Sequence, residues 1–548
     1  MLVVVLAGGA LLVSGGTSSD PRTPAGLPGL PPPFLGVAVV GDGGLTAAVD
    51  SYGVVVDLRP APAGPALIDN PAERQAAGTV APDTGIVPRL RLRDGRALPF
   101  WRADAVAQRY LPGTNVLETT ARFGQVRARV IYAARGSLLA CVTGVAPARS
   151  SFVSHSGTKD DRARLSGRDD PREHRRRGAA APTVRLAGDS GSGAGPRCDD
   201  PRARGAIAEA RRADRRWLRA STSPGSAAPA WAEALYRRSL LVLRALTDAR
   251  TGAVSAGSRD GWAYVWPRDA ATAALAFAVS GHPAEARRAA GFLDRLDLGA
   301  AARFHGDGSP VPGRDAQGDA AGWVDFATRA SGAPAGSDRE PGWRERPDYQ
   351  EKAPGEFLGN AIAATASEDP ARLSAVAIAA RFAERGALTR TAVSPGSGID
   401  SAAEHDSWVD SAAEPGPDID AAAAWAVRPF ALPRLYAPAR KSLRHLLAAG
   451  GRFGIVPSAD WPEVDPWTAP TAWAAWAFAA LAREDSDPAQ ARRDRRDALA
   501  LLADLRRAAA PAGALPERVD ARTGIPRSTT PLAWSHAFAI LTIRELWP

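Results

Sequence analysis

The 548-residue sequence contains almost no lysine. Lys159, Lys352 and Lys441 are its only lysines, so nearly all of its 68 basic residues are arginines, interleaved with 59 acidic residues. The net charge of +9 is therefore not gathered into a stripe of basic and aromatic residues, which is the usual signature of nucleic-acid binding. We expect no nucleic-acid partner and interpret these charges as a solvated surface.

Cysteine is nearly absent as well, with only Cys141 and Cys198. Two cysteines are too few for a metal cluster, and they are compatible either with one disulfide in an oxidising compartment or with two unpaired thiols. The histidines lack metal-ligand spacing. No Ser/His/Asp elbow is present, and the glycine run at 191–195 lacks both the Lys-Ser/Thr ending and the preceding strand of a phosphate-binding loop. We expect neither a metal nor another cofactor.

The N-terminus combines an apolar run at 2–16 with a tether rich in proline and glycine at 17–33. The run is too short for a comfortable membrane span and is typical of an export segment, although no Lys or Arg precedes it. We expect a secreted or cell-envelope protein, with residues 1–33 as a signal or a membrane anchor. A buried strand is the alternative, which the tether disfavours because it leaves little for such a strand to pair with.

Residues 34–202 carry short alternating or β-branched runs broken by Gly, Asp and Pro. This pattern predicts an antiparallel β-sandwich. A charged stretch near 154–200 has few large apolar side chains and is interpreted as a disordered insertion. The expected strands are 35–40, 44–50, 53–58, 115–123, 126–134 and 138–145.

The composition changes near residue 203. A linker helix is predicted within 203–228, and residues 229–548 contain helical segments rich in Ala, Leu and Trp, separated by loops rich in Gly and Pro. This series predicts an all-α toroid whose site lies at one rim. Examples of the expected helices are 230–249, 270–281, 284–296, 371–386, 420–432, 468–484, 488–509 and 531–546.

The loop at 261–271 concentrates side chains suited to carbohydrate. Sugar rings present apolar C–H faces to aromatic rings, and their hydroxyls pair with guanidinium and carboxylate groups. The alternative is an ordinary helix start in which Asp269 caps the helix and Trp266 belongs to the core. The candidate binding residues are Trp262, Tyr264, Trp266, Arg268 and Asp269.

Four segments together carry a family resemblance: WAYVWPRDA at 262–270, YRRSLLVLRALTD at 236–248, FLGNAIAA at 357–364 and PLAWSHA at 531–537. In their order along the chain these segments resemble glycoside hydrolase family fifteen, the group of glucoamylases, glucodextranases and bacterial trehalases. The resemblance implies an N-terminal β-sandwich, a linker helix and an (α/α)6 barrel. This architecture agrees with the reading of strands followed by helices.

The resemblance implies a general acid shortly before the helix that contains Leu358. The segment DYQEK at 348–352 keeps this spacing and makes Glu351 the acid, with Gln350 at a position where the family has Trp. Gln350 and Lys352 are assigned to the sugar site with it, and we expect Lys352 to turn away from the acid or to contact another carboxylate. The competing frame at 343–345 would place Arg344 where the acid belongs and lies too far from Leu358.

A second carboxylate, Glu517, lies in LPERVDARTGIPRSTTPLAWSHA at 515–537. The segment resembles the family's catalytic-base motif, so Glu517 is expected to activate water. Arg518 stands where the family usually has Gln. The alternative is a solvent-facing loop acid paired with Arg518.

Further segments of the resemblance complete the expected pocket. Asp319 and Trp323 belong to a segment similar to the family's Q-x-D-G-x-G-W, with Ala320 in place of the first Gly, and Trp467 belongs to a loop similar to N-P-W. The family's G-R-Y-P pattern appears as residues 454–457, GIVP, so Ile455 stands where the family has a sugar-binding arginine.

The expected function is release of glucose from the non-reducing ends of α-glucans or oligosaccharides by an exo-acting, inverting hydrolase. In this mechanism Glu351 protonates the leaving oxygen and Glu517 deprotonates water on the opposite face of the sugar. The departures from the motifs leave two alternatives open. One is a trehalase or another α-glucosidase of this fold, and the other is a sugar-binding or regulatory homologue without turnover.

Overall fold

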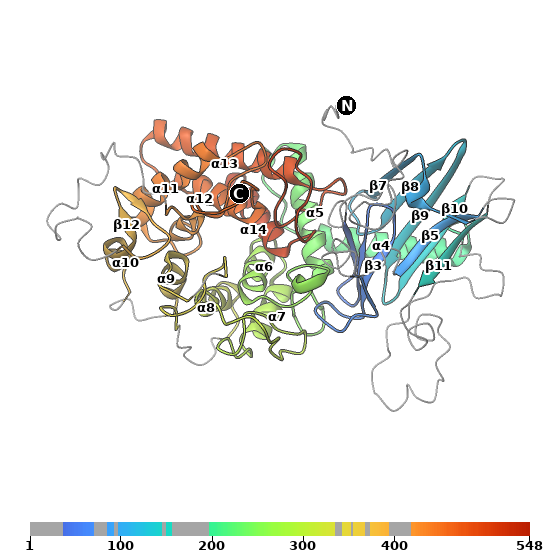
Figure 1. Cartoon of the computed structure of the whole chain (residues 1–548), viewed down its shortest axis with the longest axis horizontal. Helices are drawn as coiled ribbons and strands as arrows, with labels where there is room; N and C mark the ends of the chain where they lie inside the picture. Colours follow the sequence, from blue (N-terminus) through green and yellow to red (C-terminus); the bar gives the residue numbers. More distant parts are fainter. Residues whose placement is uncertain are drawn as a thin grey trace.

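The computed structural model describes residues 37–70, 85–91, 97–144, 149–155, 197–334, 342–351, 354–367, 373–393 and 418–548. The predicted export segment with its tether, most of the predicted insertion, and Lys352 lie outside these ranges. The described chain folds into a β-sandwich followed by a barrel of helices, which lie side by side in Figure 1.

The N-terminal domain contains two antiparallel sheets. A seven-stranded sheet has the order β1-β2-β3-β5-β11, with β4 beside β3 and β6 beside β5, and a four-stranded sheet has the order β10-β9-β8-β7. Side chains of both sheets, including Val40, Leu58, Val130 and Tyr132, share one buried core. The predicted sandwich is confirmed. Its strands are β1 (Ala38–Gly41), β2 (Thr46–Val49), β3 (Val55–Arg59), β4 (Ile68–Asp69), β5 (Gly85–Arg91), β6 (Ala97–Pro99), β7 (Ala105–Tyr110), β8 (Leu117–Phe123), β9 (Val126–Ala134), β10 (Leu138–Gly144) and β11 (Arg149–His155).

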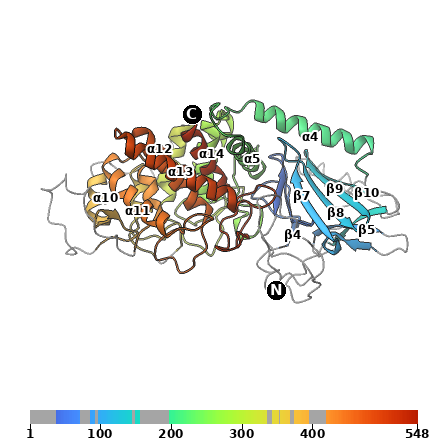
Figure 2. The ribbon, with the colours of Figure 1, turned by 90° about the horizontal axis from the view of Figure 1, so that it is seen from above.

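Helix α4 (Pro201–Arg219) joins the two domains. The Asp200 side chain accepts a hydrogen bond from the Arg202 N–H, and proline occupies the first turn, as is common at helix starts. The buried face of α4 packs on residues of the four-stranded sheet, and Figure 2 shows the helix lying along the sandwich. Just before α4, Cys198 is bonded to Cys141 of β10, with Cα atoms 5.0 Å apart. The structure therefore has the disulfide rather than two free thiols.

Six elements form the inner ring of the barrel. Each packs against the next and the last returns to the first, so the ring is closed. Most residues of these elements are buried, which explains why most of the elements are rich in Ala and aromatic residues all round rather than amphipathic. In ring order they are α6 (Pro267–Val279), α8 (Ala320–Ser331), α9 (Leu358–Ala364), the 3-10 helix η4 (Ala421–Ala426), α12 (Thr468–Glu484) and α14 (Ala533–Leu546).

Amphipathic helices surround this ring and complete the (α/α)6 barrel that the sequence predicts. Helix α13, for example, turns Leu501, Leu502 and Leu505 inward and keeps its arginines mostly outside. The outer helices within the described ranges are α5 (Ala230–Leu246), α7 (Pro283–Leu293), α10 (Ala375–Phe382), α11 (Tyr436–Ala449) and α13 (Pro488–Ala508).

Two expectations for the barrel are corrected. The helix predicted at 420–432 is only the short η4, because Pro429 lacks an N–H and restricts Arg428 before it. A two-stranded sheet, β12 (Ala383–Glu384) with β13 (Ala387–Leu388), also interrupts the helices, where no strand is expected.

The inner elements begin at a common rim. The residue before each of them is, in ring order, Trp266, Asp319, Phe357, Asp420, Trp467 and Leu532. The loops that precede them carry the residues singled out in the sequence. Gly322 permits the close packing of α8 on α9, because a Cβ atom at this position would lie 1.9 Å from the Ala363 carbonyl oxygen.

The sandwich contacts the barrel through backbone and side-chain hydrogen bonds. The Thr46 hydroxyl donates to the Ala245 carbonyl at 2.6 Å, and the Asn115 amide donates to the Leu241 carbonyl at 2.8 Å. Within the described ranges, no helix is both long and apolar enough to cross a membrane.

Candidate active site

A pocket of about 340 Å³ opens at the barrel rim. Its wall combines carboxylates, guanidinium groups and aromatic rings from the loops before α6, α8, α9, α12 and α14 and from the first turns of α6 and α14. The two predicted catalytic carboxylates both belong to it. The lining residues are Gly261, Trp262, Trp266, Arg268, Asp269, Arg303, Arg314, Tyr349, Gln350, Glu351, Trp467, Glu517, Leu532 and Trp534.

The backbone around Glu517 is fixed on both sides. The Glu517 N–H donates to the Thr529 carbonyl at 2.9 Å, and the Glu517 carbonyl accepts from the Thr468 N–H at 2.9 Å. Two residues earlier, the Leu515 N–H donates to Nε2 of the fully buried His536 at 2.9 Å. Burial lowers the pKa of His536 to about 3, so the ring stays neutral and can accept this bond. The histidine of the PLAWSHA segment thus holds the loop that presents Glu517.

The Glu517 carboxylate is held from two directions inside the pocket. Trp262 Nε1 donates to Oε1 at 3.3 Å, and the Ser528 hydroxyl donates to Oε2. Burial raises the pKa of Glu517, while the Ser528 and Trp262 hydrogen bonds and the charges of Arg518 and Arg314 oppose this rise. A hydrogen-bonded carboxylate with a raised proton affinity is suited to act as a general base.

Glu351 lies at the exposed side of the pocket. It ends a tight turn in which its N–H donates to the Asp348 carbonyl at 2.9 Å, and its backbone has a φ of 57°. A positive φ is unusual for a residue with a side chain and costs about 1 to 3 kcal/mol. The side chain is 34% exposed and forms an ion pair with Arg314.

Arg268 is the buried cation of the pocket floor. Its Nη1 donates to Asp319 Oδ2 at 2.6 Å and to Gln317 Oε1 at 2.8 Å, and its guanidinium carbon lies 4.4 Å from the ring centre of Trp534. Asp319 therefore supports the floor from behind and is not a lining residue.

Asp269, next to Arg268 in the first turn of α6, is 3% exposed. Burial raises its pKa to about 7, and the negative charges of Glu517 and Asp319 add to the rise against the pull of Arg268. Asp269 is thus a pocket carboxyl that holds a proton in weak acid.

Aromatic rings form much of the remaining wall. Three tryptophans that the sequence predicts as binding residues, Trp262, Trp266 and Trp467, line the pocket together with Trp534. Trp467 is packed edge to face against Trp461, with ring centres 5.0 Å apart. Their flat faces are suited to stacking on apolar sugar faces.

Several predicted residues have other positions. Tyr264 lies outside the lining and packs against His305, with Arg303 over its ring. Trp323 is fully buried beneath the pocket in an aromatic cluster with Trp425. Lys352 lies outside the described residues.

Gln350 lines the pocket, but its amide is already engaged. Its Nε2 donates to the Tyr349 hydroxyl at 3.0 Å and to Asp420 Oδ2 at 3.2 Å, and its Oε1 accepts from Ser458 at 3.3 Å. Gln350 therefore forms a fixed part of the pocket wall rather than supplying a free hydrogen-bond donor.

Sequence reasoning missed six lining residues, namely Gly261, Arg303, Arg314, Tyr349, Leu532 and Trp534. Arg303 and Arg314 lie in the irregular segment between α7 and α8, where no motif draws attention to them. Tyr349 and Trp534 lie within the motifs DYQEK and PLAWSHA quoted above, so these motifs could have identified them as site residues. Arg518 forms an ion pair with Glu463 and is not a lining residue.

The described part of the chain contains no group of three or more His, Cys, Asp or Glu side chains arranged to hold a metal ion. In the competing frame for the acid, Arg344 lies near Glu356 at 3.8 Å, and neither it nor Glu345 lines the pocket. The pocket therefore brings together Glu351 and Glu517 with guanidinium groups and tryptophan rings.

Comparison with solved structures shows the same fold. A bacterial glucoamylase complexed with acarbose matches with a TM-score of 0.55 and 11% identity, over 100% of this chain and 96% of that chain. Matches over part of the chain include a wild-type glycosidase (TM-score 0.41, 20% identity, 57% of this chain and 96% of that chain) and the Saccharomycopsis fibuligera glucoamylase (TM-score 0.44, 12% identity, 59% and 97%). No protein-family profile and no curated protein sequence matches.

Proposed function

We propose that this protein is an inverting glycoside hydrolase that releases glucose from the non-reducing ends of α-linked glucans or oligosaccharides. The observation that carries the proposal is the presence of Glu351 and Glu517 in one pocket, together with a buried guanidinium and several tryptophans. The bacterial glucoamylase that shares the fold was solved with acarbose, which is consistent with a sugar ligand here.

In the proposed mechanism Glu517 is the general base. Trp262 and Ser528 hold its two oxygens, so the carboxylate presents a defined edge to an attacking water. Glu351 donates a proton to the leaving glycosidic oxygen from the exposed side of the pocket. Inverting enzymes separate such carboxyls by about 6.5 to 9.5 Å, which leaves room for the water.

The terminal sugar is placed by Arg268, Asp269 and the tryptophans. Arg268 is fixed by Asp319 and Gln317, so it can orient hydroxyl groups without a further loss of side-chain entropy. Asp269, protonated in weak acid, can donate a hydrogen bond to a hydroxyl as well as accept one.

Two alternative functions are each favoured by one observation. A trehalase or another α-glucosidase of this fold is favoured by Ile455, which replaces an expected sugar-binding arginine. A non-catalytic sugar-binding homologue is favoured by the Arg314–Glu351 ion pair, since a guanidinium stabilises the ionised form and a general acid must carry a proton.

The test is glucose release from maltose, maltotriose, isomaltose and trehalose by the purified protein, with Glu351→Gln and Glu517→Gln as variants. We expect release by the wild type that falls at least about 100-fold in each variant, as loss of a general acid or base predicts. Release from trehalose alone would favour the trehalase. A folded wild-type protein that releases glucose from none of them would favour the sugar-binding protein.

We also propose that the protein acts outside the cytoplasm, as the apolar N-terminal run suggests. Fractionation of cells that produce the full chain tests this, and activity confined to the cytoplasm would contradict it.

A further inference from the structure

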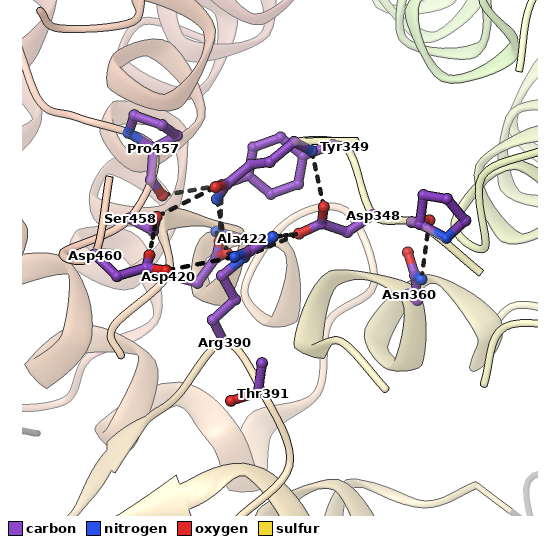
Figure 3. A network of polar contacts seen from close by, with 12 residues as sticks. Asp348, Tyr349, Asn360, Arg390, Thr391, Asp420, Ala422, Pro457, Ser458 and Asp460 are labelled. Atoms are coloured by element: carbon purple, nitrogen blue, oxygen red, sulfur yellow. Dashed lines mark hydrogen bonds and ion pairs between the residues drawn. The ribbon is translucent and has the colours of Figure 1, made fainter. Parts of the chain in front are cut away.

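A buried cation lies behind the turn that carries Glu351. Arg390 is 2% exposed and donates to Asp348 Oδ2 from Nε at 3.0 Å and from Nη2 at 2.6 Å. It also lies 3.4 Å from Asp420 and 3.6 Å from Asp460. Figure 3 shows Arg390 between these carboxylates.

The network joins three loops of the barrel rim. Asp348 begins the turn of Glu351, Asp420 precedes η4, and Asp460 follows the segment in which Ile455 replaces the expected arginine. The Tyr349 hydroxyl lies 2.9 Å from both Asp420 Oδ1 and the Pro457 carbonyl, and its single proton is shared between these two acceptors. Arg390 thus gathers three loops that are far apart in the sequence.

Arg390 is the only cation that the ion-pair geometry places against Asp348 and Asp420 among the described residues. Burial raises the pKa of Asp348, and burial also raises the pKa of Asp420, to about 7, while Arg390 opposes both rises. Without the Arg390 guanidinium, the buried Asp348 and Asp420 carboxylates would lose most of the positive charge that offsets the cost of burying them.

The turn itself requires support. Asp348 Oδ1 accepts from the Gln350 N–H at 3.0 Å, and the next residue, Glu351, has the unfavourable positive φ. Such a conformation persists only where the surroundings fix it. Asp348 supplies that support through one oxygen and is itself held through the other by Arg390.

We propose that Arg390 is a positioning residue for the Glu351 turn, which it sets through Asp348 without touching the sugar. Arg390 is not a lining residue of the pocket. It therefore affects the reaction through the position of the acid, Glu351. This inference rests on the proposed function of Glu351.

The test compares two substrates in Arg390→Lys. Maltose needs a proton on its leaving oxygen, whereas α-glucosyl fluoride has a leaving group that departs without a general acid. A displacement of about 1 Å at a catalytic group costs on the order of 100-fold in rate. We therefore expect kcat on maltose to fall by roughly 100-fold, with a fall of less than about 5-fold on α-glucosyl fluoride.

Arg244→Gln is the matched control, because Arg244 forms a comparable buried ion pair with Asp214 at 2.6 Å, between α5 and α4. It should lower the melting temperature while leaving kcat on both substrates within about 2-fold. If Arg390→Lys does not fold, Asp348→Asn keeps an oxygen for the Gln350 N–H but loses the charge, and it should show the same difference between substrates.

Equal losses on the two substrates, or full activity on maltose in a folded variant, would overturn the proposal. A wild-type protein inactive on both substrates would instead contradict the proposed function, so the two failures are distinguishable.

Discussion

Trp262 and Glu517 are 255 residues apart in sequence, yet the indole Nε1 lies 3.3 Å from the Glu517 carboxylate. This hydrogen bond joins the loop before α6 to the loop before α14 at the floor of the pocket. It also ties an aromatic wall of the pocket to the group that we assign as the base.

Trp262→Phe should therefore change both rate and pH dependence. The Trp262 hydrogen bond lowers the pKa of Glu517, so its loss raises that pKa and moves the acidic limb of the kcat/KM profile to higher pH. We expect a rate loss of about 10-fold at the optimum, equal to about 1.4 kcal/mol. Rates on maltose from pH 4 to pH 8 measure this, and an unmoved acidic limb would show that the contact does not influence the base.

Arg314→Gln should shift the whole pH profile of kcat/KM to higher pH. Arg314 pairs with Glu351, and its charge also lowers the pKa of Glu517. Removal of the cation favours the protonated acid and raises the pKa of the base, so both limbs should move to higher pH. Arg237→Gln, which removes an exposed cation on α5, serves as the control. A shift confined to the acidic limb would argue against Glu351 as the acid.

Asp269→Asn should alter how stability depends on pH. The pKa of Asp269 is raised from 3.8 to about 7, so the folded protein binds the proton more tightly than the unfolded chain. Its stabilising contribution is full below pH 4 and is lost as the pH rises through 7, a difference of roughly 4 kcal/mol.

Asparagine has no proton to lose. The melting temperature of Asp269→Asn, relative to wild type, should therefore be higher at pH 8 than at pH 5. Thermal unfolding at the two pH values measures this, with the exposed Asp297→Asn as the control. An equal difference in melting temperature between Asp269→Asn and wild type at both pH values would contradict the raised pKa of Asp269.

Much of this site follows from short motifs in the loops before inner helices. The chemistry of its loop predicts Trp266 as a binding residue, and the family resemblance implies Glu351 and Glu517; all three line the pocket. Arg314 and Arg390 could not be found in this way. Arg314 contacts Glu351, 37 positions away, and Arg390 contacts Asp348, 42 positions away. A short sequence motif cannot predict contacts between residues so far apart.

The fold shows a similar division. The sequence predicts six of the strands, β1, β2, β3, β8, β9 and β10, together with most of the long helices, whereas it misses β4, β5, β6, β7 and β11. In β5, Pro88 interrupts the strand pattern. Helix η4 was predicted too long, because its alanines favour a helix that Pro429 then prevents.

Removal of the disulfide should weaken the sandwich and spare the pocket. The bond joins residues separated by 57 positions, and chain-entropy arguments give about 4 kcal/mol for a loop of that length. Cys141→Ser with Cys198→Ser should lower the midpoint of urea unfolding while kcat remains within about 2-fold. A stability equal to that of the oxidised protein would mean that the bond constrains the unfolded chain little.

The configuration of the first glucose released tests the central claim most directly. Proton NMR of wild-type protein with maltotriose should show β-glucose before mutarotation, and Glu517→Gln at the same concentration should show none on that timescale. Initial release of α-glucose, or β-glucose at an unchanged rate from Glu517→Gln, would contradict an inverting hydrolase with Glu517 as its base.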